Sequence, residues 1–223
     1  LQKQYQHAIL NEKLKKNFLK KKYLSKLIVP KFENYKKIKH QIKNNYLMSK
    51  INDENMSFIY TFSKLIKIRK KSFINTMQTF KGLSHRLELI YKDSNLEFIN
   101  DSKSTNLVSC KVALNCFKNI IWIAGGIRKK DELSYLDDSI SSIKAAFFIG
   151  ESAGEFESYF RKFFYCKNTI NIKYALIEAI KYSKKLKGHS TILFSPACAS
   201  YDQFKNYEER GKIFVEQVNK YKN

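Results

Sequence analysis

Short apolar runs and helical stripes alternate along the last two thirds of the chain. The apolar runs have the length of strands and lie at residues 87–91, 98–100, 120–124, 145–149 and 191–194. Between and after them, apolar residues recur at the three- and four-residue spacing that places them on one face of a helix. Such alternation is typical of a mostly parallel sheet covered by helices. We therefore predict an α/β fold with a Rossmann-like, mostly parallel sheet.

Four helical stripes belong to this pattern. The first begins where a strand meets a cluster of hydroxylated residues, and the last lies near the C-terminus. Their members are Leu107, Cys110, Leu114 and Phe117; Ala153, Phe156, Phe160 and Phe163; Ile172, Leu176, Ile180 and Ser183; and Tyr207, Gly211, Phe214 and Val218.

The first third of the chain follows a different pattern and predicts a separate domain. Residues 27–30 form a short strand candidate closed by proline. Two helices follow, and Gly82 can end the second in a left-handed conformation. We place the domains at residues 1–84 and 85–223. The apolar stripes of the two helices are Ile59, Phe62 and Ile66, and Phe73, Met77 and Phe80.

The ends of four predicted strands carry polar or glycine-rich segments, at residues 101–103, 125–129, 150–152 and 195–200. In parallel sheets, ligands bind beyond the carboxyl ends of the strands. Lys103 and Lys129 would converge there with a serine-rich loop. Such a site suits a ligand with carboxylate or phosphate groups.

Lys103 occupies an unusual position, because the Ser/Thr cluster around it falls where helix N-caps belong. The N-terminus of a helix carries partial positive charge and repels a lysine, unless an anion is shared between them. Lys103 is therefore a candidate anion ligand, and the alternative is an exposed lysine in a lysine-rich chain.

Several other chemistries find no support in the sequence. Gly125 and Gly126 do not form a GxGxxG fingerprint, and no GxxxxGK[ST] phosphate loop occurs. A Ser/His/Asp triad fails because His189 precedes the last strand, away from the serines that follow it. We predict that His85 is a surface or packing histidine. The four cysteines lack zinc-site spacing and read as reduced thiols of a cytoplasmic protein.

The net charge of +22 suggests nucleic-acid binding at first sight. Nearly all of the excess is lysine, whereas arginine is the better fork for phosphate and guanine. We therefore expect a compositional bias and no specific nucleic-acid partner. No apolar run approaches the ~18 residues of a membrane span, and no signal sequence is recognisable.

Four motifs together carry a resemblance to a known family. They are GLSHR at 82–86, FINDSKSTN at 98–106, AGG at 124–126 with Lys129, and SPACASYDQFKNYEERG at 195–211. In order and spacing they resemble the C-terminal part of Mur ligases, in particular of the members that add D-glutamate. The resemblance covers residues from about 50 to 223. It implies that this chain holds a Rossmann-like C-terminal domain and the end of a central ATP-binding domain.

The resemblance also implies an activity. Such ligases use ATP and Mg²⁺ to phosphorylate the carboxylate of UDP-N-acetylmuramoyl-L-alanine, and D-glutamate attacks the acyl phosphate during peptidoglycan precursor synthesis. The phosphate loop, the metal-binding residues and the sugar-nucleotide domain are not among these 223 residues. We expect a fragment that is inactive alone, from a cytoplasmic bacterial enzyme that is monomeric at full length.

Site roles are carried over by resemblance, residue by residue. Lys103 would act at the reacting centre as the catalytic residue. The resemblance implies nucleotide contacts from Asn52, Asn55, Arg86 and Asp101, and D-glutamate contacts from Thr105, Lys129, Ser200, Tyr201 and Tyr207. From the residues alone, three alternatives stay open: Asp101 as an N-cap, Ser200 as a turn hydroxyl and Tyr207 as a core aromatic.

The sequence departs from the family pattern at three positions. Ile51 stands in place of a histidine, Ser84 in place of a proline, and Tyr207 in place of a phenylalanine. None of these changes removes a charged contact. Two other functions remain open: a ligase for a different amino acid, as in other Mur ligases or folylpolyglutamate synthase, and a basic binding module or remnant without activity.

Overall fold

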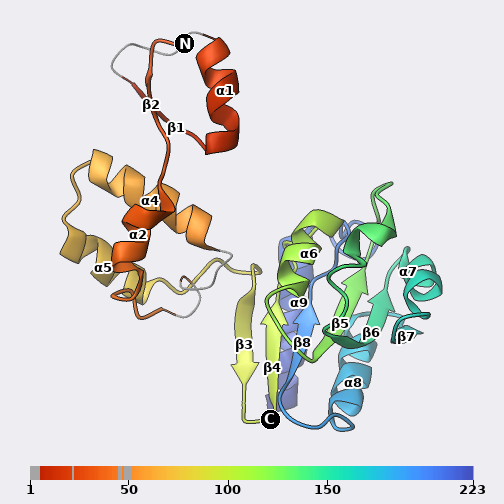
Figure 1. Cartoon of the computed structure of the whole chain (residues 1–223). Coiled ribbons are helices and arrows are strands. Elements are labelled where there is room, and N and C mark those ends of the chain that lie inside the picture. Colours follow the sequence, from red (N-terminus) through yellow and green to blue (C-terminus); the bar gives the residue numbers. More distant parts are fainter. Residues whose placement is uncertain (1–5, 22, 45–46, 48–51, 223) are drawn as a thin grey trace. The chain divides into compact units, whose positions relative to one another are not determined.

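The computed structural model describes residues 6–21, 23–44, 47 and 52–222, and the chain divides into two compact units (Figure 1). The first unit is Leu1–Gly82 and the second is Leu83–Asn223. The division falls two residues before the boundary placed from the sequence. The two units are described separately below.

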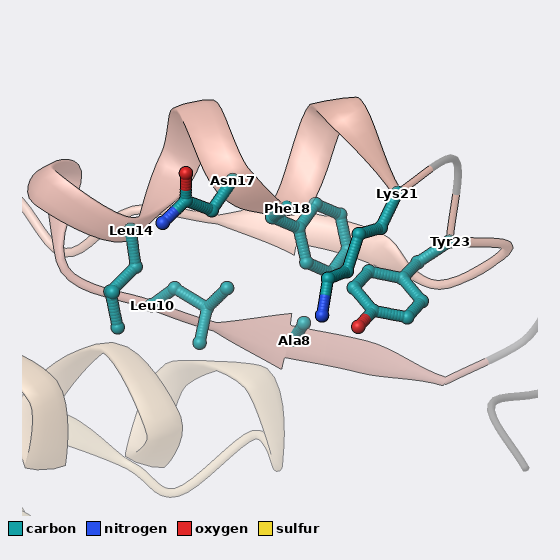
Figure 2. A pocket seen from close by; sticks show the side chains of 7 residues that line it. All are labelled: Ala8, Leu10, Leu14, Asn17, Phe18, Lys21 and Tyr23. Atoms are coloured by element: carbon teal, nitrogen blue, oxygen red, sulfur yellow. The ribbon is translucent and has the colours of Figure 1, made fainter.

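The first unit begins with a parallel pair of short strands, β1 (His7–Ile9) and β2 (Lys26–Ile28), joined by α1 (Glu12–Lys20). The strand predicted at 27–30 is thus β2, which ends before the proline. Figure 2 shows a pocket of about 270 Å³ between α1 and β1, where the rings of Phe18 and Tyr23 lie 5.0 Å apart.

The described residues of the rest of this unit include the helices α2 (Phe32–Lys39), α4 (Asp53–Leu65) and α5 (Lys70–Thr79). Both helices predicted here are present, but the stripe assigned to α4 faces the wrong way. Its buried side carries Met56, Ser57, Tyr60 and Ser63. The predicted core-facing residues are exposed, Ile59 by 42%, Phe62 by 51% and Ile66 by 51%.

The reason is that serines can be buried in a helix when their hydroxyls bond to its own carbonyls. Ser57 Oγ donates to Asp53 O at 2.7 Å, and Ser63 Oγ donates to Tyr60 O at 2.8 Å. Tyr60 then packs on Phe73 of α5 with ring centroids 5.1 Å apart. A count of apolar positions alone does not recognise this face.

The second unit is built on a six-stranded sheet with the order β3-β4-β8-β5-β6-β7. Only β3 is antiparallel to its neighbour, so the predicted α/β fold with a mostly parallel sheet is confirmed. The strands are β3 (Glu88–Lys92), β4 (Leu96–Asn100), β5 (Ile120–Gly125), β6 (Ile143–Ile149), β7 (Tyr165–Asn168) and β8 (Ser190–Phe194).

Helices cover both faces of this sheet: α6 (Leu107–Leu114), α7 (Ala153–Phe160), α8 (Ile172–Ser183) and α9 (Tyr207–Lys222). Alternate strand residues point to opposite faces, so Trp122 and Phe148 pack with α6 and α7. Ile121 and Phe147 point the other way and pack with α8 and α9.

The sequence pattern did not predict two elements of this unit. One is the edge strand β7, which is mostly exposed and therefore lacks an apolar run. The other is a 3₁₀ helix at Leu133–Leu136. The first two stripes of this unit also extend past the helices, which end at Leu114 and Phe160. Within the described residues, no helix is long and apolar enough to cross a membrane.

Candidate functional site

The carboxyl ends of the central strands lie level at one edge of the sheet. Asn100 of β4 and Ile123 of β5 are both register partners of Phe194 in β8. Gly125 of β5 is the partner of Ile149 in β6. Because these four strands are parallel, the segments that follow them leave the sheet at the same edge, as predicted.

The turn after β4 carries Lys103 and Thr105, but it is not the first turn of α6. The helix begins at Leu107, and Asn106 is its N-cap, accepting a hydrogen bond from Ser109 N at 2.9 Å. Lys103 therefore lies four residues before the helix, so the predicted repulsion by the helix N-terminus is no argument for an anion beside it. The N-cap is thus Asn106 at the end of the turn, and the sequence pattern of the Ser/Thr cluster did not identify this residue as the cap.

Lys103 is exposed and is placed by neighbours from distant parts of the sequence. Its backbone N donates to His85 O at 3.0 Å. Its Nζ lies 5.8 Å from the centre of the Tyr207 ring, on the first residue of α9. Tyr207 is partly exposed and carries this cation on its face. The structure thus brings together Lys103 and Tyr207, which are more than a hundred residues apart.

The loops after β5 and β8 are joined by backbone pairing. Ile127 and Ala199 form an antiparallel bridge, with both N-H···O=C distances at 2.9 Å. Gly125 N also donates to Pro196 O at 2.9 Å. The bridge brings the segment that carries Lys129 next to Ser200.

Side chains from this pair of loops differ in exposure. Lys129 and Tyr201 are exposed, so their functional groups are open to a ligand. Ser200 is buried, and its carbonyl accepts hydrogen bonds from Gln203 N at 3.3 Å and Phe204 N at 2.9 Å. Its backbone therefore opens a turn.

Asp101 directly follows β4, and its side chain is buried. Its Oδ1 accepts from Leu87 N at 3.1 Å, and its Oδ2 accepts from Ser195 Oγ at 2.8 Å. Asp101 therefore links two loops, and the N-cap alternative is wrong because Asn106 caps α6. Burial raises the pKa of the Asp101 carboxyl to about 6, although these hydrogen bonds and the Arg86 guanidinium favour its charged form.

This raised pKa predicts a pH dependence of stability. The folded protein holds the Asp101 proton more tightly than the unfolded chain, whose carboxyl has its ordinary pKa of 3.8. The stabilisation is therefore complete below pH 4 and is lost as the pH rises through about 6, by about 3 kcal/mol for a shift of this size. We expect the difference in unfolding free energy between wild type and Asp101→Asn to follow this course in urea titrations at pH 4 to 7. A difference independent of pH would contradict it.

Arg210 is a site residue that sequence reasoning missed. Its side chain on α9 is fully buried. It donates from Nε to Ser102 Oγ at 3.1 Å, from Nη2 to Ser102 O at 2.8 Å and from Nη1 to Cys198 O at 3.0 Å. Burial lowers the pKa of the guanidinium to about 10. The available signal was an arginine one residue before Gly211, in the most distinctive of the four motifs.

His85 has a packing role, as predicted. It is buried, and its Nδ1 lies 2.9 Å from Asn100 Nδ2. A Cβ atom added at Gly211 would lie 2.3 Å from His85 Nδ1, so the ring occupies the space that this glycine leaves open. The histidine thus holds the segment before β3 against β4 and α9.

The other predicted nucleotide residues lie in both units. Asn52 is buried just before α4, and Asn55 is exposed on its first turn. Arg86 and Ser84 are exposed in the second unit. Ile51, one of the departures from the family pattern, lies outside the described residues.

The residues at this edge of the sheet do not fit a magnesium ion. Mg²⁺ requires oxygen ligands in near-octahedral geometry. The carboxylates that follow these strands, those of Asp101, Glu151 and Asp202, do not come together as a set of metal ligands. In the part of the chain that the structure describes, no group of three or more His, Cys, Asp or Glu side chains could hold a metal.

Comparison with known proteins gives one consistent answer. The chain is 39% identical over 169 residues to UDP-N-acetylmuramoylalanine--D-glutamate ligase of a Wolbachia from Brugia malayi, which covers 76% of this chain and 34% of that protein. It is 34% identical over 178 residues to the protein of the same name from Rickettsia prowazekii, covering 77% of this chain and 39% of that protein. The chain belongs to the Mur ligase family. No protein-family model matches it.

Solved Mur ligases share the fold of this chain. MurF from Acinetobacter baumannii superimposes with a TM-score of 0.56 at 15% identity, over 75% of this chain and 38% of that one. MurC from Thermotoga maritima gives a TM-score of 0.50 at 12% identity, over 76% and 37%. This Mur ligase chain spans only about a third of the length of the curated relatives described above.

Proposed function

We propose that this chain is the amino-acid-binding part of an ATP-dependent ligase that adds D-glutamate to UDP-N-acetylmuramoyl-L-alanine in the bacterial cytoplasm. The observation that carries the proposal is the joining of the Lys103 turn and the Lys129 loop, through the loop after β8, at one edge of the sheet. Glutamate has two carboxylates, and two exposed ammonium groups on linked loops suit such a ligand. The curated relatives are named for this same ligase.

The chemistry divides between this chain and the rest of the enzyme. A carboxylate of the sugar-nucleotide substrate takes the γ-phosphoryl group of ATP, and the amine of D-glutamate then attacks the carbonyl carbon. Phosphate leaves as the amide forms, and the amine releases a proton. Reactions of this kind depend on positioning and on the neutralisation of charge. ATP and Mg²⁺ would be held mainly by residues outside this chain, which is inactive alone.

Each site residue has a proposed task. Lys103 neutralises the charge that develops at the acyl phosphate, with Thr105 beside one glutamate carboxylate. Lys129 and the residues around it hold the other carboxylate; these are Ser200, Tyr201 and Tyr207. Asn52, Asn55, Arg86 and Asp101 contact the nucleotide. Asp101 can do so while keeping its two internal bonds, because a carboxylate has about four lone-pair positions.

A titration with the two glutamate enantiomers tests this proposal on the chain as it stands. We expect D-glutamate to shift the backbone amide resonances of Lys103, Lys129 and Ser200, and L-glutamate to bind about 10-fold more weakly or worse. Amide chemical shifts detect millimolar affinities, which suit an isolated part of a site. Lys129→Ala is the matched control and should abolish most of the shifts.

The other outcomes decide between the alternatives. A preference for L-glutamate would contradict the D-glutamate assignment and favour a ligase for another amino acid. Shifts confined to other parts of the chain, or none with either enantiomer, would favour a binding module or remnant.

A further inference from the structure

Arg210 carries a buried charge whose hydrogen-bond partners are all neutral. In the described structure its side chain donates three hydrogen bonds, to the hydroxyl and carbonyl of Ser102 and to the carbonyl of Cys198. The side chain is fully buried. Arginine is rarely buried without a carboxylate in direct contact, because the loss of hydration is costly, and here the Asp202 carboxylate acts on the guanidinium without a hydrogen bond to it. A buried guanidinium that bonds only to neutral groups therefore requires an explanation other than packing.

The three acceptors lie on the two segments that build the candidate site. Ser102 precedes Lys103 directly in the turn after β4. Cys198 precedes Ala199, the residue that pairs with Ile127 in the Lys129 loop. The planar guanidinium of Arg210 therefore connects the Lys103 turn to the paired loops by hydrogen bonds.

A second contact ties this arrangement to α9. Ser102 Oγ donates to Tyr207 O at 2.8 Å while it accepts from Arg210 Nε. The start of α9, which carries the Tyr207 ring beneath Lys103, is thus fixed by the same serine. Hydrogen bonds of Arg210 and Ser102 thus connect the turn after β4, the loop after β8 and the start of α9.

We propose that Arg210 is a positioning residue that sets the separation of Lys103 and Lys129, and so the span between the two anionic groups that the site accepts. The identity of these groups as the carboxylates of D-glutamate rests on the proposed function. The coupling of the Lys103 turn to the Lys129 loop does not rest on it. The guanidinium suits this task because its donors form a rigid planar fork, whereas a lysine ammonium is one flexible point of charge. Its buried positive charge also favours an anion at this edge of the sheet.

Arg210→Lys tests the proposal, because it keeps the charge and removes the fork. We expect hydrogen exchange of the Lys103, Ile127 and Ala199 amides to become about 10-fold faster or more. These amides make the bonds that hold the turn and the loops. Exchange at Trp122 and Phe148, inside β5 and β6, should change much less. Arg161→Lys is the matched control, since Arg161 is exposed at the end of α7.

A second variant covers the case in which Arg210→Lys fails to fold. Ser102→Ala removes only a hydroxyl, leaves the Ser102 carbonyl for Nη2 and should speed exchange at the same amides to a smaller extent. Equal acceleration at strand and loop amides in the folded variants would mean that Arg210 only stabilises the domain, and would overturn the proposal. Unchanged loop exchange would overturn it as well.

Ligand titration separates this inference from the proposed function. In Arg210→Lys we expect the affinity for D-glutamate to fall about 10-fold or more, since a changed separation of the two ammonium groups weakens the charge-assisted hydrogen bond to one of the two carboxylates. Faster hydrogen exchange of the loop amides together with full D-glutamate affinity would contradict the proposal that Arg210 sets the separation of the two lysines for the ligand. If the wild-type chain does not bind D-glutamate, the proposed function fails, while selective loop exchange would still support the coupling.

Discussion

Replacement of Lys103 by alanine is expected to lower kcat about 10²-fold in an enzyme assembled by fusing this chain to the N-terminal two thirds of its Wolbachia relative. Lys103 lies exposed at the carboxyl edge of the sheet, over the face of Tyr207. We place it next to the acyl phosphate, where negative charge develops during attack by the amine. Loss of such an electrostatic contact typically costs 10²-fold or more in kcat. Steady-state kinetics with saturating ATP measures the effect.

Lys129→Ala is the comparison that gives this result its meaning. Lys129 is also exposed but lies in the loop after β5. An ammonium opposite a glutamate carboxylate stabilises ground state and transition state about equally, so its loss should raise KM for D-glutamate more than it lowers kcat. Equal losses of kcat in both variants would show that the roles are misassigned. Full activity of both would argue against the family mechanism.

Gly126→Ala is expected to lower the free energy of unfolding by about 3 kcal/mol or more. Gly126 has φ of +128°, a conformation that costs other residues about 1–3 kcal/mol. A Cβ atom there would also lie 2.2 Å from Ala199 O and 3.1 Å from Cys198 Cβ. The clash falls on the backbone that pairs with Ile127, so the loops must separate. Urea unfolding measures the loss, and the response to D-glutamate should disappear with it.

Gly154→Ala is the matched control for this substitution. Gly154 lies in α7, and a Cβ atom added to it meets nothing within 4 Å. Alanine in a helix is favoured over glycine by about 0.5–1 kcal/mol, so this variant should be as stable as wild type or slightly more stable. Similar destabilisation by both substitutions would mean that the approach of the two loops is not close enough to require glycine.

The sheet and the place of the site follow from local sequence. Buried strands such as Ile120–Gly125 show as continuous apolar runs because both of their faces are covered. A parallel order of such strands places their polar ends at one edge, so Lys103 and Lys129 could be assigned to the same side of the sheet before any contact was known. The edge strand Tyr165–Asn168 could not be found in this way, because exposed positions require no apolar residues.

Tertiary structure decided what local patterns leave open. Periodicity finds a helix but cannot tell that Ser57 and Ser63 of α4 are buried while Ile59 and Phe62 are exposed, since that choice depends on which neighbours the helix meets.

The sequence by itself thus determined the fold class and the family. The contacts of the site were decided only by the tertiary structure. Asp101 becomes a link between Leu87 and Ser195, and Arg210 a link between Ser102 and Cys198, through hydrogen bonds that span up to 108 residues. Local propensity contains no information on pairs so distant in sequence, because their energy arises only when folding brings them together and removes them from water.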